Sequence, residues 1–344
     1  LRFVADANPD GDAGNFLALL DALDAEGYNT ALGQISPARF AATDALVVDA
    51  ARAFTSNQAA YLSARRAGFD RGFIQPIAPL PKPGSMASLQ PSSVVLAQAI
   101  EEADGDDDRP LTPGRRLAGP RAGEDPEAAR HGAYFRIYGL SNQQDTTPNR
   151  TGFDAETFGG QVGYHYDLSD DFLLGVALSY GNTSADYDDG LGTLDSNSVR
   201  VGPYASWSFD RLYVDASLTF AYHLFDAERA IPDLDLAAES DYDGYELTGY
   251  LGAGYSFSMD YGITLTPMAS IQYSYFDIES FTESGAGGAN LAVDGRSTDS
   301  LRTRLGLDAS VRTPLDLIPY AFVGWEHEFF DEDESLSAAF VNGG

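Results

Sequence analysis

Three arginines and four acids are the side chains from which we expect specific polar contacts. The arginines lie in one Ala-rich segment, and the acids lie in the second half of the chain. They are Arg52, Arg65 and Arg66, and Asp215, Asp308, Glu326 and Glu328. A guanidinium and a carboxylate form strong, often paired hydrogen bonds. If the Ala-rich segment is a helix that the second half of the chain encloses, these arginines and acids predict ion pairs between the helix and the wall around it. A helix packed on the outside would instead leave the arginines solvated.

The residue types give little support to catalysis or metal binding. The chain has no Cys, which excludes thiol catalysis, disulfides and Cys-ligated zinc. Its four His lack HExxH spacing, and no GxSxG motif offers a nucleophilic serine. Acidic loops at 186–195 and 233–243 contain oxygen ligands of the kind that Ca²⁺ prefers, but they lack EF-hand spacing. Solvated loop charge is the favoured interpretation, and we predict no catalytic residue, no metal and no cofactor.

The overall charge excludes one class of partner. The 344 residues contain 52 acids and 21 Lys and Arg, which gives a net charge of −31. Because phosphate binding needs clustered cations, we expect no nucleic-acid partner. No run of about 18 apolar residues is present, so the sequence predicts no transmembrane helix.

The arginines belong to a helix-forming first half. Residues 38–67 are Ala-rich and contain no Gly or Pro, Ser36 can cap the start, Pro37 suits the first helical position, and Gly68 can end the helix. Residues 15–33 predict a shorter helix before it.

A change of composition then separates the two halves of the chain. Residues 69–131 are rich in Pro and acids, which indicates a linker that is mostly disordered or extended, with a possible short helix at Ser93–Ala103. We therefore expect four parts: a passenger-junction helical segment at 1–37, a candidate pore helix at 38–68, the linker at 69–131, and a barrel at 132–344.

The second half alternates with a period of two, which indicates strands with one apolar and one polar face. In one segment, Leu212, Val214, Ala216, Leu218, Phe220 and Tyr222 oppose Tyr213, Asp215, Ser217, Thr219 and Ala221. Aromatic residues near the strand ends, which include Phe225 and Phe276, fit interfacial girdles. We predict nine strands, at 133–142, 154–168, 172–185, 195–209, 212–227, 244–259, 263–278, 299–313 and 318–330.

The connections between these strands alternate in length. Short turns are expected at 169–171, 209–211, 260–262 and 314–317, and long polar loops at 143–153, 186–194, 228–243 and 279–298. Tight turns at one end and long loops at the other are typical of an outer-membrane barrel. The alternative is a soluble antiparallel barrel or sandwich, which would turn its apolar face inward.

A membrane barrel must close, because unpaired backbone groups are costly in lipid. Nine strands are an odd number, whereas bacterial single-chain barrels have an even number. We therefore expect the sequence to be truncated at both ends and to lack about three closing strands, with 339–344 as the start of a tenth strand or its loop.

Several stretches of the second half carry a family resemblance. They are Gly159-Gly160-Gln161-Val162-Gly163-Tyr164, Leu174-Gly175-Val176-Ala177-Leu178-Ser179-Tyr180-Gly181, Tyr204-Ala205-Ser206-Trp207, Tyr213-Val214-Asp215 and Val323-Gly324-Trp325-Glu326-His327-Glu328-Phe329. In this order they resemble the β-domain of autotransporters (type Va secretion). Gln34-Ile35-Ser36-Pro37 and the Ala-rich helix after it resemble the segment that this family places between passenger and barrel.

The resemblance implies an all-β transmembrane barrel of twelve strands, nine of them present here, whose lumen is threaded by a helix linked to an exported passenger. It also implies a bacterial outer-membrane location, the barrel-assembly machinery as a partner, and a passenger at the cell surface or outside. The linker is longer than the family's usual gap, which leaves helix 38–67 and helix 93–103 as alternative plugs. A lumen of intermediate width suits a slim, Ala-rich helix.

Some members of the family cleave their own linker within the lumen, using acids and an Asn near the helix. By that resemblance Asn57 and the acids Asp215, Glu326 and Glu328 are candidates, but structural acids are the favoured interpretation. We predict a translocator that anchors and exports an N-terminal passenger and that is not an enzyme. The alternatives are a porin-like or adhesin barrel without a passenger, and a soluble β-rich binding module.

Overall fold

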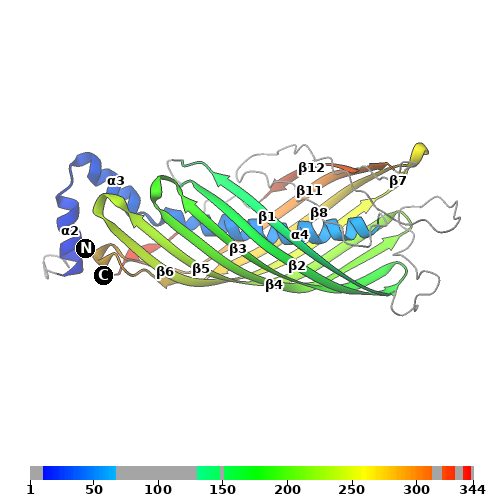
Figure 1. Ribbon diagram of the computed structural model, residues 1–344, viewed down its shortest axis with the longest axis horizontal. Helices are drawn as coiled ribbons and strands as arrows, with labels where there is room; N and C mark the ends of the chain where they lie inside the picture. Colours follow the sequence, from blue (N-terminus) through cyan, green and yellow to red (C-terminus); the bar gives the residue numbers. More distant parts are fainter. Residues whose placement is uncertain (1–10, 67–129, 148–150, 312–319, 330–335, 342–344) are drawn as a thin grey trace.

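The computed structural model describes residues 11–66, 130–147, 151–311, 320–329 and 336–341 (Figure 1). The alternative plug at 93–103 and nearly all of the predicted linker at 69–131 lie outside these residues. The structure therefore covers the helical first part, the strands and most of their connections.

Residues 11–66 form three α-helices and one 3₁₀ turn. They are α2 (Asp12–Asp21), α3 (Ala25–Ile35), η1 (Pro37–Phe40) and α4 (Ala41–Arg66). Ser36 caps η1 by accepting a hydrogen bond from the Ala38 backbone nitrogen at 3.3 Å. None of the helices in the described part of the chain is both long and apolar enough to cross a membrane.

The predicted single helix at 15–33 is wrong, because the chain forms two helices there. Asp24 begins α3, and its side chain accepts a hydrogen bond from the Gly27 backbone nitrogen at 2.9 Å. A side chain that caps a new helix in this way competes with continuation of the preceding one.

The described residues then form nine long strands, and each one before β12 pairs antiparallel with the next long strand in the chain. They are β1 (His131–Gln144), β2 (Phe153–Ser169), β3 (Phe172–Tyr187), β4 (Gly192–Phe209), β5 (Leu212–Ile231), β6 (Leu236–Tyr255), β8 (Ile263–Ile278), β11 (Arg296–Val311) and β12 (Tyr320–Glu328). This meander confirms the predicted fold class. The sheet curls into a half-barrel, with β1 and β12 as its two edges among the described strands, and α4 runs along its inside (Figure 1).

The two faces of the sheet are inverted relative to a soluble protein. On β5, Asp215 and Thr219 are buried against the interior, whereas Leu218 and Phe220 are about half exposed, at 53% and 48%. Large apolar side chains are exposed in the same way along the other long strands, among them Phe135, Phe158, Leu178, Val199, Leu251, Ile271, Leu305 and Val323. A polar interior with an apolar exterior is the pattern of a barrel that faces lipid, and the soluble alternative requires the opposite.

For two aromatic residues, the predicted position in the interfacial girdles is wrong. Phe225 and Phe276 are each 2% exposed and belong to the interior apolar cluster. On β5, the outward positions are the even-numbered ones, so the ring of Phe225 points inward while Tyr222 and Leu224 remain exposed. The physical reason is the strict two-residue repeat of a strand, which overrides local composition.

The strands extend further at the long-loop end than predicted. The predicted loop at 228–243 is a projecting hairpin, in which only η4 (Pro232–Leu234) and Asp235 separate β5 from β6. The loop at 279–298 contains two short strands, β9 (Phe281–Thr282) and β10 (Leu291–Val293), and a 3₁₀ turn, η6 (Gly287–Ala289). At the other end, two residues suffice for the turns β2–β3 and β4–β5.

The expected tenth strand does not continue the large sheet in the part of the chain that the structure describes. Residues Ala338–Phe340 form β13, which pairs with β10 at the long-loop end. The resulting three-stranded sheet, β13-β10-β9, lies at the same end of the molecule as α2 and α3 (Figure 1).

Candidate functional site: the lumen around helix α4

Helix α4 fills the concave side of the sheet through small residues and two apolar contacts. Ala51 and Ala53 are almost completely buried, which lets the backbone approach the wall. Toward the long-loop end, Leu46 and Val47 join an apolar cluster with strand residues. Toward the turn end, Phe54 packs in a second cluster with Tyr134, Leu173, Ala177 and Tyr204. The Ala-rich composition therefore matches the narrow space.

Arg66 and Asp215 are brought together at the turn end. The Arg66 Nη1 atom lies 2.8 Å from Asp215 Oδ1 and 3.3 Å from Ser206 Oγ. The guanidinium also lies 3.6 Å from the centre of the Tyr213 ring. The last turn of α4 is thus fixed to β4 and β5, and its cations offset the negative end of the helix dipole.

Arg65 pairs with side chains of β2, which are not among the four predicted acids. Its Nη2 atom is 2.5 Å from Asp167 Oδ2, and its Nη1 atom contacts the His165 ring nitrogen Nε2. The His165 Nδ1 atom lies 3.1 Å from the Tyr204 hydroxyl on β4. The end of α4 therefore spans β2 to β5.

Arg52 and Glu326 form the contact between the middle of α4 and the edge strand β12, at 2.8 Å. Glu326 also lies 3.3 Å from Arg302 and 3.9 Å from Arg304 of β11. Glu328 forms an ion pair with Arg302 at 3.2 Å. One turn earlier on α4, Asp49 accepts a hydrogen bond at 2.6 Å from Asn142, which belongs to the opposite edge strand, β1.

Asp308 is the remaining predicted acid. It lies on β11 opposite Thr266 of β8 and Phe322 of β12.

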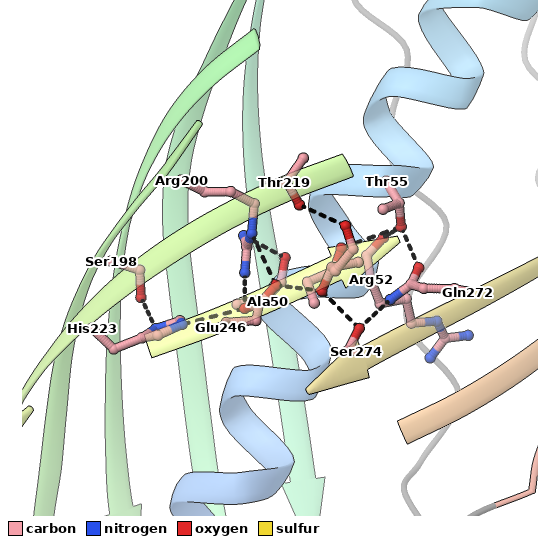
Figure 2. A network of polar contacts seen from close by, with 12 residues as sticks. Ala50, Arg52, Thr55, Ser198, Arg200, Thr219, His223, Glu246, Gln272 and Ser274 are labelled. Carbon is pink, nitrogen blue, oxygen red and sulfur yellow. Dashed lines mark hydrogen bonds and ion pairs between the residues drawn. The ribbon is translucent and has the colours of Figure 1, made fainter. Parts of the chain in front are cut away.

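A polar network that sequence reasoning missed surrounds the middle of α4 (Figure 2). Arg200 of β4 forms an ion pair with Glu246 of β6 through two hydrogen bonds, and its Nη1 atom donates to the Ala50 carbonyl oxygen of α4 at 3.2 Å. His223 of β5 lies 3.2 Å from Glu246 and 2.7 Å from Ser198. Arg200 and Glu246 are 2% and 0% exposed, so the pair is fully enclosed.

The network continues to α4 through neutral side chains. Glu246 accepts from Thr248 at 2.6 Å, the Thr248 and Ser274 hydroxyl oxygens lie 2.8 Å apart, and Gln272 donates to Ser274 at 3.3 Å. The Gln272 carbonyl oxygen then accepts from the Thr55 hydroxyl at 2.6 Å (Figure 2). A buried network with its members paired specifies one position of the helix.

The start of α4 is fixed at the long-loop end. Asp44 lies 3.0 Å from Arg296 of β11, which also donates to the Phe40 carbonyl oxygen at 2.7 Å. Arg39 of η1 donates to the Gln34 carbonyl oxygen at 2.7 Å. Burial, with the nearby Arg229 charge, lowers the pKa of Arg39 to about 10, so it remains a cation at neutral pH.

The missed residues share one signal that the sequence does contain. Asp167, Arg200 and Glu246 all occupy inward positions of the alternating strands, as Asp215 does. A charge on the polar face of a strand is a candidate partner for the helix. Within the described residues, which include both acidic loops, no three His, Cys, Asp or Glu side chains are grouped to hold a metal ion.

Comparison with known proteins agrees with this geometry. The family profile "Autotransporter beta-domain" matches residues 133–344. An extracellular serine protease of Serratia marcescens is 28% identical over 224 residues, covering 62% of this chain and 21% of the relative. Outer membrane protein A of Rickettsia conorii is 26% identical over 201 residues, covering 55% of this chain and 10% of the relative.

A solved structure shares the fold. The translocator domain of the autotransporter NalP from Neisseria meningitidis aligns with a TM-score of 0.51 at 14% identity, covering 60% of this chain and 70% of that one. The chain spans about a fifth of the length of the Serratia relative. Together, the family match, the polar lumen and the lipid-facing exterior show that the chain belongs to the autotransporter β-domain family, the outer-membrane translocators of bacteria.

Proposed function

We propose that α4 is the pore helix of this translocator, and that it occupies the lumen after an N-terminal passenger has been exported. The observation that carries the proposal is the attachment of one helix to the inward face at both of its ends. Arg66 pairs with Asp215 near the short turns, and Asp44 pairs with Arg296 near the long loops. A helix that lay outside the sheet would not have these partners.

The direction of α4 supports export of what precedes it. In outer-membrane barrels the short turns are periplasmic and the long loops are extracellular. The start of α4 lies at the long-loop end, so residues 11–35 are outside the cell and the passenger precedes them. The end of α4 and the start of β1 both lie at the turn end, where Arg65 contacts His165 and Gly132 is close to Arg65. The proposed order is therefore passenger junction (1–37), pore helix (38–68), linker (69–131) and barrel (132–344).

The mechanism is passive and needs no catalytic residue. The apolar exterior anchors the barrel in lipid, and the polar interior tolerates a crossing chain. Asp215 and Glu326 are engaged by arginines, which supports a structural role for these acids in place of general-base chemistry. The barrel-assembly machinery is the partner that this class of barrel implies.

The test uses the full-length protein displayed on bacterial cells, with an epitope placed immediately before residue 11. Antibody should reach the epitope on intact cells. The purified protein in planar bilayers should have a low conductance, and the variant with Arg52, Arg65 and Arg66 all changed to Ala should conduct several-fold more. A matched control changes Arg211, on the β4–β5 turn, to Ala. An epitope that is reached only after the outer membrane is broken would overturn the proposed direction of export.

A further inference from the structure

Residues 11–40 form a small folded module on the long-loop end, beyond the sheet (Figure 1). We call this module, which contains α2, α3 and η1, the latch. Its apolar side packs on the loop that joins β5 to β6 and on the loop that joins β8 to β11. The cluster contains Phe16, Leu20, Ala31 and Ile35 of the latch and Ile231, Leu234, Ala238, Ala286 and Ala289 of the strands and loops.

A fully buried arginine ties the latch to both loops. Arg229 of β5 is 1% exposed and forms an ion pair with Glu283 through two hydrogen bonds, one of them 2.6 Å long. It also donates to the Ala289 carbonyl oxygen at 2.8 Å and to the Ile35 carbonyl oxygen at 3.3 Å. Ile35 is the last residue of α3, so the cation lies at the negative end of that helix dipole.

A second arginine, Arg39, belongs to the latch and binds backbone oxygens of the strands and loops. Arg39 donates to the Ala230 carbonyl oxygen at 3.2 Å and also contacts the Leu191 carbonyl oxygen of the β3–β4 loop. The Gln34 side chain accepts from the Asp233 backbone nitrogen at 3.2 Å. The latch thus touches the loops β3–β4, β5–β6 and β8–β11, and these contacts exist only when it is on the outer side.

We propose that the latch is a one-way closure of the extracellular mouth. The inference rests on the proposed direction of export. Residues 11–40 cross the lumen before they fold, because a pair of helices, each about 10–12 Å across, is wider than a lumen that α4 alone fills. Once outside, the latch docks on the loops, covers the mouth above α4 and prevents the exported chain from sliding back.

Gly288 of η6 allows the latch to be opened by one substitution. A Cβ atom at this position would lie 2.3 Å from the Asp12 carbonyl oxygen and 2.8 Å from Phe16 Cβ. The Gly288→Leu side chain therefore displaces the latch from this loop. In the displayed full-length protein, we expect added protease to cleave within the latch at least tenfold faster, and bilayer conductance to rise several-fold. Gly33→Ala is the matched control, because nothing lies within 4 Å of a Cβ there. Wild-type protease and conductance values for Gly288→Leu would overturn the proposal.

An engineered disulfide provides a second test, in which the latch is held on its loop and is not displaced from it. A Cβ at Gly287 would lie 4.0 Å from Asp12 Cβ, which is within the range for a disulfide. The chain has no other cysteine, so Asp12→Cys/Gly287→Cys can form only this bond. Oxidant added to intact cells that lack periplasmic disulfide formation should cross-link most molecules, whereas Asp12→Cys/Gly33→Cys should stay reduced.

The two proposals fail in different ways in this experiment. If the epitope is displayed but both cysteines remain open to a membrane-impermeant maleimide after oxidation, the latch is wrong and the translocator proposal stands. If the wild-type epitope never reaches the surface, the proposed direction of export is wrong. If the oxidised protein is cross-linked and resists protease, and reduction restores wild-type cleavage, the latch is supported.

Discussion

Arg66 of α4 is held between Asp215 and Tyr213 of β5, 2.8 Å from the carboxylate and 3.6 Å from the centre of the ring. The two partners are inward residues two positions apart on one strand, so a single strand face presents both a counterion and an aromatic surface to the helix. Asp215 is 2% exposed, so water cannot solvate its carboxylate in place of Arg66. The contact explains how the last turn of a slim helix is fixed to the inward face of the sheet.

Replacing one partner of this pair is expected to destabilise the folded protein more than replacing both partners by apolar residues. Asp215→Asn leaves the Arg66 cation buried without a counterion, at a cost of about 3–5 kcal/mol. The double variant Arg66→Met/Asp215→Leu should recover most of that loss. Equilibrium unfolding in lipid vesicles measures the cycle, and equal losses for the single and double variants would contradict a direct pairing.

The Arg200–Glu246 pair should behave in the same way and should also report on the helix. Glu246→Gln removes the anion that two arginine hydrogen bonds and His223 engage, which we expect to cost about 3 kcal/mol or more. Because Arg200 also donates to the Ala50 carbonyl oxygen, conductance through the lumen should increase. Glu228→Gln, on an outward position of β5, is the control and should change neither measurement.

Inward tyrosines lie opposite glycines on neighbouring strands, and one such pair offers a packing test. Tyr134 of β1 is paired with Gly163 of β2, and its ring stacks on Tyr61 of α4 with 4.1 Å between centroids. A Cβ at Gly163 would lie 2.0 Å from the Tyr134 ring, so Gly163→Ala displaces that ring from α4. We expect a loss of roughly 1–3 kcal/mol from overpacking.

The glycine test has an internal control and a rescue. Gly249→Ala on β6 should be nearly neutral, since nothing lies within 4 Å of a Cβ there. Adding Tyr134→Leu to Gly163→Ala should cost less than the sum of the two single changes. Strict additivity in heat-modifiability or unfolding measurements would show that the two positions do not meet.

The lipid-facing exterior predicts a dependence on depth. Leu218 lies in the middle of β5 and is 53% exposed. Leu218→Arg should destabilise the protein in vesicles by about 2–4 kcal/mol, because a cation is costly at the centre of a bilayer. Glu228→Arg, nearer the long-loop end of the same strand, should cost roughly 0–1 kcal/mol. Similar small effects at both positions would indicate that water surrounds the whole strand.

The sequence by itself determined the strands, their faces and the lumen-sized helix. Alternation is a local property, because successive side chains of a strand point to opposite sides whatever surrounds them. The nine predicted segments therefore match β1–β6, β8, β11 and β12. Likewise, the Ser36-Pro37 start and the Ala-rich run after it encode η1 and α4, whose observed bounds lie within a few residues of the predicted ones.

Local composition predicts the wrong structure where a single residue changes the outcome. Asp24 divides the first helical stretch into α2 and α3, since its side chain caps the second helix. Phe225 was expected at the membrane surface but lies inside, where it stacks on Tyr242 with 5.0 Å between ring centroids. The cap of one side chain in the first case, and the inward position of one strand residue in the second, outweighed the composition of the surrounding segment.

Only the tertiary structure decided which charges meet. Arg66 reaches Asp215 and Arg52 reaches Glu326, whereas Arg65 turns to Asp167, and the fully buried Arg200–Glu246 pair lay outside the predicted set. These pairings depend on the rotation and depth of α4 in the lumen and on the register of every strand across the sheet. That information is shared among residues that are 46 positions apart in the Arg200–Glu246 pair and more than 100 apart in the contacts of α4, so no short window of sequence contains it.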